Sequence, residues 1–169
     1  MNRYASTKNF KSKIPLVFNL SMQLVSIRFR SPKSISMSLE FSIAKTVVSS
    51  KNFHRLEANA YETVLKETID LPIVAIYDSR KARFMPQTID VGILSNHAGF
   101  NKKLANGSIN ISQMLNSKAL VSREQIKLDK CVDKSAILNV KIILDFKGTQ
   151  SVNEVDSIDQ SKFSLSTIR

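Results

Sequence analysis

The residue types that most often perform catalysis or bind metal ions are scarce in this chain. It has one cysteine, Cys131, and two histidines, His54 and His97. Cys131 lies between Asp129 and Asp133, and nearby negative charge disfavours the thiolate form that a nucleophile needs. The histidines have no cysteine or glutamate at the spacings of zinc sites, so we expect both at the surface. The sequence predicts neither a catalytic thiol nor a metal centre.

Phosphate-binding loops are also missing from the pattern. The four glycines, Gly92, Gly99, Gly107 and Gly148, are too dispersed for a P-loop or a dinucleotide-binding turn. A single cysteine forms no internal disulfide, which favours a reducing compartment. We therefore predict that the protein is not an enzyme and uses no cofactor.

Alternation of apolar and polar side chains is the strongest structural signal. In residues 35–43 every second side chain is apolar, and Ser36, Ser38, Glu40 and Ser42 fall on the other face. We expect that serine-lined face to be exposed or covered by a partner. The same alternation is found in residues 16–24, 89–93, 126–128 and 138–146. These segments are predicted as half-buried strands, and the first should extend to Phe29 after a face switch near Val25.

Several connections can be predicted between these strands. Asn106-Gly107 is a strong turn dipeptide, and residues 130–135 supply a polar hairpin loop before the last strand. Residues 95–103 have the composition of a polar loop. The continuous apolar run 71–77 is typical of a central strand covered on both faces.

Residues 46–72 leave the topology open. Residues 47–48 and 61–65 have strand character, whereas residues 55–62 could form a short helix. Further along, the strands follow one another at short spacing with turn signals between them. That order predicts an all-β antiparallel sandwich.

Two motifs carry a resemblance to a known family. The stretch GSINIS begins at Gly107, and IKLDKCVDKSAILNVKI begins at Ile126 after a polar spacer. Together they resemble the closing half of the N-terminal type of C2 domain (NT-C2), in which a "G…INL" strand precedes an "L.L..C.D..A.L.V.I" pair. Ile111-Ser112 stand where that family continues with Asn-Leu, and its arginine- and tryptophan-bearing middle strands are not recognisable here. The resemblance implies a C2-like β-sandwich.

Length and composition fit one domain with extensions. The chain has 169 residues, of which 43% are hydrophobic, and no apolar run approaches the roughly 20 residues of a membrane-spanning helix. We predict a basic N-terminal arm over residues 1–13, a C2-like sandwich over residues 14–148 and a polar C-terminal extension over residues 149–169.

The resemblance also raises the question of calcium, which many C2 domains bind through aspartates in the loops at one end. A hard cation needs several convergent oxygen ligands. The two corresponding loops, residues 30–34 and 95–103, contain no acid. We therefore expect a calcium-independent domain.

The net charge of +11 is unevenly distributed. No acidic residue precedes Glu40, whereas seven cations do: Arg3, Lys8, Lys11, Lys13, Arg28, Arg30 and Lys33. An acid-free, serine-containing basic start resembles a mitochondrial targeting segment, which we expect to be uncleaved. The alternative is a basic arm that binds a partner, in a cytoplasmic or cytoskeletal protein.

Three kinds of binding function remain. The first is a non-catalytic adaptor or accessory subunit of a large protein assembly, such as a mitochondrial membrane complex. The second is a calcium-independent peripheral module for anionic lipid, and the third is an RNA-contacting ribosomal accessory protein, with Phe29 as a stacking ring. The candidate lipid- or partner-binding residues are Arg28, Arg30, Lys33, Lys102 and Lys103, with Arg3, Lys8, Lys11 and Lys13 in the arm.

Overall fold

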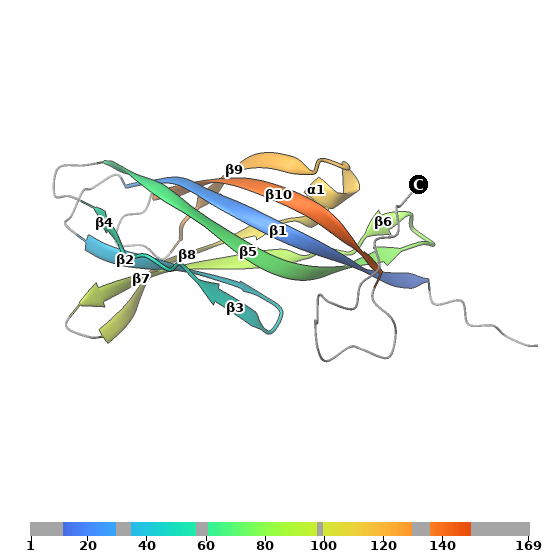
Figure 1. Ribbon diagram of the computed structural model, residues 1–169, viewed down its shortest axis with the longest axis horizontal. Coiled ribbons are helices and arrows are strands. Elements are labelled where there is room, and N and C mark those ends of the chain that lie inside the picture. The colour runs from blue at the N-terminus through green and yellow to red at the C-terminus, as the bar shows by residue number, and fades with distance from the viewer. Residues whose placement is uncertain (1–11, 30–34, 57–60, 98–99, 130–135, 150–169) are drawn as a thin grey trace, which may run out of the picture.

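The computed structural model describes residues 12–29, 35–56, 61–97, 100–129 and 136–149, which form two antiparallel β-sheets (Figure 1). Sheet A has the strand order β6 (Arg83–Phe84), β5 (Glu62–Asp78), β1 (Lys13–Arg28), β10 (Ile137–Thr149) and β9 (Val121–Lys127). Sheet B has the order β3 (Thr46–Ser49), β2 (Ile35–Ile43), β7 (Thr88–His97) and β8 (Phe100–Asn110), and β4 (His54–Leu56) also pairs with β2. A short helix, α1 (Ser112–Asn116), connects β8 to β9. The predicted all-β antiparallel sandwich is confirmed.

Strand β1 is the centre of sheet A, because it pairs with β5 on one side and with β10 on the other. Its inward side chains, Phe18, Leu20, Met22 and Leu24, are buried. The register shifts between Leu24 and Ser26, and the extra residue at this bulge moves Ile27 back into the core. The predicted face switch near Val25 is therefore confirmed.

The core lies between the inner faces of the two sheets. Residues that alternate along β2 and β10 are buried there, as their sequence pattern predicts. Each large apolar side chain that is fully buried contributes about 1.5 to 3 kcal/mol before conformational entropy is subtracted. The largest of them are Phe41, Leu20, Met22, Ile27, Met37, Leu39, Leu65, Leu71, Ile73, Ile89 and Ile93.

Aromatic side chains close one end of the sandwich. The Phe18 ring lies edge-on to Phe84 and Phe146, with centroid distances of 6.1 and 5.4 Å. Tyr77 contacts Phe84 in the same geometry at 5.2 Å. The backbone N–H of Phe84 donates a hydrogen bond to Oδ1 of Asn116, 2.7 Å away. This bond attaches β6 to the end of α1, a helix that the sequence did not predict.

The turn predicted at Asn106-Gly107 is wrong, because both residues lie inside β8. A Cβ atom on Gly107 would lie 2.6 Å from the carbonyl oxygen of Lys127 and 2.9 Å from Cγ2 of Ile126. Asn106 and Asp129 exchange two backbone hydrogen bonds of 3.0 and 2.6 Å. The glycine lets β8 approach the edge of sheet A, so this pair joins the two sheets.

The polar loop predicted over residues 95–103 is largely strand. β7 continues to His97 and β8 begins at Phe100. The register between them shifts at Ile93 and Leu94. Most of residues 95–103 are polar, so the sequence shows no apolar alternation there and its pattern predicts a loop.

The strand predicted over residues 71–77 is confirmed as part of β5, but it is not a central strand covered on both faces. These residues belong to β5, whose side away from β1 pairs only with the two residues of β6. On that side the carbonyl oxygens of Val74 and Ile76 accept hydrogen bonds from Gln87 Nε2 (3.0 Å) and from the N–H of Met85 (2.8 Å). Pro72 is an even-numbered residue of β5, like Val74 and Ile76, so a backbone N–H at this position would point away from β1. Proline lacks this N–H and is expected at such positions, where no neighbouring strand needs it.

The stretch that the sequence left open contains β3, β4 and the start of β5. Residues 57–60, the predicted loop 30–34 and the hairpin loop 130–135 lie outside the described residues, but the antiparallel pairing of β9 with β10 is confirmed. Most of the predicted arm and extension also lies outside them. Lys13 begins β1 and Thr149 ends β10.

Candidate interaction surfaces

The outer face of sheet A carries a group of cations from three strands. Because Leu138, Val140 and Ile142 are buried, Lys141 points away from the core, and Arg123 lies opposite it on β9. Ile137 lies between Lys127 and Arg28 in the same register. We call the four residues Arg28, Arg123, Lys127 and Lys141 the basic face. None of them forms an ion pair with another described residue.

A partly buried polar network lies on the same face of sheet A. The bulge in β1 places Ser26 on the outer side, where only 5% of it is exposed. Its hydroxyl donates a hydrogen bond to Oε1 of Glu62 (2.6 Å) and accepts one from Nδ2 of Asn139 (3.0 Å). These bonds connect β5, β1 and β10 and so fix the strands that carry Arg28 and Lys141.

Three members of the basic face were not predicted from the sequence. The pattern before Ile126 predicts a polar spacer, although Val121, Arg123, Gln125 and Lys127 occupy every second position. That spacing puts their side chains on one face of a strand. The strand gave no apolar alternation, because two of its inward residues, Ser122 and Glu124, are polar.

The cations that were predicted do not form one site. Arg28 ends β1 in sheet A, whereas Lys102 and Lys103 lie on β8 in sheet B. Lys13, at the far end of β1 from Arg28, pairs in register with Asp78. The other predicted residues, Arg30, Lys33, Arg3, Lys8 and Lys11, lie outside the described residues.

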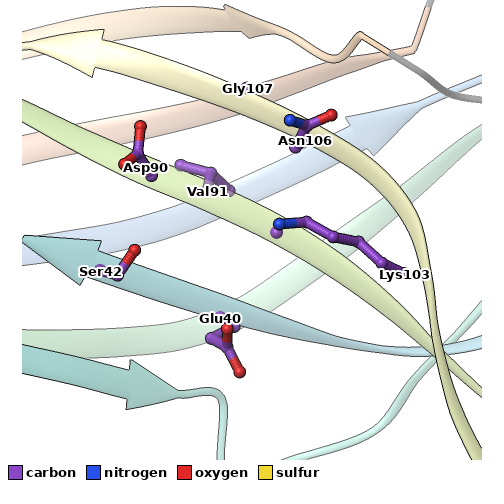
Figure 2. Close-up of a pocket in the computed structure, with 8 residues that line it drawn as sticks. Glu40, Ser42, Asp90, Val91, Lys103, Asn106 and Gly107 are labelled. Carbon is purple, nitrogen blue, oxygen red and sulfur yellow. The ribbon is translucent and has the colours of Figure 1, made fainter.

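Lys103 reaches a shallow polar pocket on the outer face of sheet B (Figure 2). Gly92 of β7 lines the pocket and has no side chain to fill it. The Lys103 side chain extends from β8 towards β7. Its Cε atom lies 3.4 Å from the position that a Cβ on Gly92 would take. The pocket has a volume of about 300 Å³ and is lined by Glu40, Ser42, Asp90, Val91, Gly92, Lys103, Asn106 and Gly107.

The chemistry of this pocket is limited to hydrogen bonding and charge. Glu40 and Asp90 supply carboxylates, Lys103 an amine and Asn106 an amide, and no lining residue carries a thiol or an imidazole. Among the described residues, no three histidines, cysteines, aspartates or glutamates gather where they could hold a metal ion. The pocket can therefore receive a polar group of a partner.

The histidine predicted at the surface, His54, is instead largely buried. Its Nε2 lies 2.9 Å from Oε2 of Glu67, and the two side chains are 10% and 6% exposed. The other carboxylate oxygen of Glu67 accepts a hydrogen bond from the N–H of Lys51. His54 belongs to β4 and Glu67 to β5, so this pair ties the two sheets at the side opposite the Asn106–Asp129 contact. Cys131 lies outside the described residues, and of His97 the structure describes only the backbone, at the end of β7.

Glu67→Ala should destabilise the domain by about 1 to 3 kcal/mol, because the largely buried His54 side chain loses its partner and the Lys51 N–H loses an acceptor. Glu67→Gln keeps an acceptor oxygen and should cost less. Urea denaturation followed by circular dichroism measures both changes. Equal stability of the alanine variant and the wild type would show that the pair does not hold the sheets together.

Comparison with known proteins identifies which solved structures share this fold. No protein-family model matches the chain, and no curated protein sequence matches it. Among solved structures, extended synaptotagmin 2, with its SMP domain and two C2 domains, superposes with a TM-score of 0.55 at 19% identity, over 78% of this chain and 28% of that chain. A fragment of the same protein that holds only the two C2 domains gives a TM-score of 0.54 at 19% identity, over 78% of this chain and 40% of that chain.

A smaller protein matches over nearly its full length. A C2-domain-containing protein from a putative elicitor-responsive gene superposes with a TM-score of 0.55 at 12% identity, over 79% of this chain and 92% of that one. Human GIVD cytosolic phospholipase A2 matches with a TM-score of 0.56 at 9% identity, over 80% of this chain and 16% of that one. The chain thus spans less than half of the extended synaptotagmin structures but nearly all of this C2-domain-containing protein.

Within the described residues, no helix has both the length and the apolar character to cross a bilayer. Two antiparallel sheets around one apolar core, with C2 domains as structural neighbours, define the architecture. This protein has the fold of a C2 domain.

Proposed function

We propose that this protein is a non-catalytic C2-like module of the N-terminal C2 type that acts as an adaptor or accessory subunit of a larger protein assembly. The basic face is the observation that carries the proposal. Four cations from β1, β9 and β10 lie on one sheet surface without an ion-pair partner among the described residues. Such a surface attracts acidic partners and raises the rate of association with them.

Apolar side chains beside the basic face favour a protein partner. Val121 is 54% exposed and lies opposite Ile143, one row from Arg123 and Lys141. The preceding residue, Leu120, is also exposed. Protein interfaces combine apolar contact with arginine in this way.

The charge of the N-terminal segment supports a mitochondrial membrane assembly as the place of action. Seven cations precede the first acid, and such segments direct proteins to mitochondria. A fluorescent fusion of residues 1–40 should accumulate in mitochondria. Diffuse fluorescence in the cytosol would remove this part of the proposal and would favour a cytoplasmic or cytoskeletal assembly.

Charge reversal on the basic face tests the main proposal. The double variant Arg123→Glu/Lys127→Glu should migrate in native gels as free protein, whereas the wild type should migrate with a large complex. Lys45→Glu/Lys81→Glu makes the same change in net charge at exposed positions elsewhere and should stay in the complex. Release of both double variants to the same extent would mean that net charge, and not this surface, matters.

An anionic membrane surface is the second candidate, and the same cations favour it. Each basic residue near such a surface contributes about 1 kcal/mol. A membrane module would sediment with phosphatidylserine-containing vesicles and dissociate as salt is added. An assembly subunit should stay in the supernatant with the same vesicles and remain in its complex.

A further inference from the structure

β9 is an edge strand of sheet A, and none of the described strands extends the sheet beyond it. The strand pairs with β10 on one side, and no described strand continues the sheet on the other (Figure 1). An edge of this kind presents backbone N–H and C=O groups to any strand that can align with it. The residues that present these backbone groups determine which strand can bind there.

The hydrogen bonds at both ends of β9 identify these residues. The N–H of Leu144 donates to the carbonyl oxygen of Leu120 at 2.8 Å, and the N–H of Leu128 donates to the carbonyl oxygen of Ala136 at 3.0 Å. Even-numbered residues therefore point their backbone groups at β10. Because the groups alternate along an antiparallel strand, the odd-numbered residues point theirs away from β10. Those residues are Val121, Arg123, Gln125 and Lys127.

Asp129 shows that the backbone groups of odd-numbered residues, which point away from β10, can pair with another strand. It continues the same odd-numbered series, and its N–H and C=O both bond to Asn106 of β8. Next to Asp129, the close approach of Gly107 leaves no room for another strand at the backbone of Lys127. Residues 121–125 have no backbone partner on this side among the described residues.

The side chains select the charge of an incoming strand. Val121, Arg123, Gln125 and Lys127 point to the outer surface of the sheet, where Lys141 adds a further positive charge in the row of Arg123. Cross-strand neighbours of opposite charge stabilise a sheet, and like charges destabilise it. A strand that places acids beside Arg123 and Lys127 would therefore be favoured.

We propose that the open edge of β9 binds an extended segment of a partner protein in which acidic and apolar residues alternate. The segment adds a strand along residues 121–125, with its acids on the outer face near Arg123 and Lys127 and its apolar residues, at the alternate positions, on the inner face. The proposal rests on the proposed function and names the partner's chemistry. A second copy of this chain is a poor occupant, because two β9 strands in antiparallel register would bring their arginines and lysines together.

A ten-residue peptide of alternating valine and aspartate is the probe. Added to the full ¹⁵N-labelled chain, it should shift the amide signals of residues 121–127 and bind at least tenfold more tightly than the matched valine–lysine peptide. Added salt should weaken it. No binding, or equal binding of both peptides, would overturn the proposal.

Gln125→Pro tests the edge itself. Proline removes an N–H that points away from β10 and leaves the pairing with β10 intact, so the variant should melt like the wild type but lose at least tenfold in affinity for the acidic peptide. Gln125→Ala keeps the N–H and should bind normally. Unchanged binding by a folded Gln125→Pro variant would place the contact on the face of the sheet and refute the edge.

The proposed function and the edge proposal can be refuted independently of each other. If Arg123→Glu/Lys127→Glu leaves the native complex while Gln125→Pro remains in it, the basic face binds a partner without strand addition, and only the edge proposal falls. If both variants remain in the complex although Gln125→Pro no longer binds the peptide, the edge proposal stands and the role in assembly falls.

Discussion

Ile142→Asp should leave no folded protein at room temperature. Ile142 is fully buried on β10 opposite Met22 of β1, the centre of the core. The variant loses the transfer free energy of a large side chain and places a carboxylate without a partner among apolar groups, which together cost well over about 5 kcal/mol. A domain of this size has about 5 to 15 kcal/mol in total. Far-ultraviolet circular dichroism and the cooperativity of guanidinium unfolding measure the loss.

The same result is expected for Leu39→Asp in sheet B, since Leu39 is equally buried on β2. Ser38→Asp is the matched control, because Ser38 points to the opposite face of the strand and stays partly exposed. It should change stability by less than about 1 kcal/mol. A cooperative, native-like transition in either core variant would contradict the arrangement of the inner faces.

Gly107→Ala should destabilise the domain by about 1 to 3 kcal/mol, although it adds one carbon atom to a strand. The new Cβ would lie 2.6 Å from the carbonyl oxygen of Lys127, a backbone atom that moves only if β9 moves. We expect the Asn106–Asp129 hydrogen bonds to lengthen or break with it. Thermal unfolding and hydrogen exchange at the amides of these two residues would detect both effects.

Gly92→Ala provides the comparison. There the nearest atom to a new Cβ is Cε of Lys103 at 3.4 Å, the far end of a flexible side chain that can move aside. The substitution also restricts the unfolded chain, so stability should be unchanged or rise by up to about 1 kcal/mol. Equal losses in the two variants would mean that the close approach of β8 to β9 has no special role.

The strands with one apolar face were the part of the fold that the sequence could predict. β2 and the core of β1 and β10 show strict alternation, because one face packs on the core and the other meets solvent. Even the bulge near Val25 was visible as a switch in the alternating pattern. The all-β class follows from these strands alone.

Features set by contacts distant in sequence could not be predicted. Gly107 has the composition of a turn, but its role comes from Lys127, which only the folded chain brings near. His54 gave no metal or catalytic pattern, and its partner Glu67 approaches from the other sheet. The basic face combines residues of β1, β9 and β10, which are far apart in the sequence. Cations that are close together in the sequence were predicted as the site instead.

The pairing of β1 with β10 has a consequence for how the protein is made. The hydrogen bond between Ser26 and Asn139 spans 113 residues of sequence, so β1 leaves the ribosome well before β10, one of its two neighbours in the sheet. At about 5 to 20 residues per second, that interval is on the order of 10 s. During it β1 lacks this second neighbour, which makes the nascent chain a natural client for a holding chaperone until β10 has been synthesised.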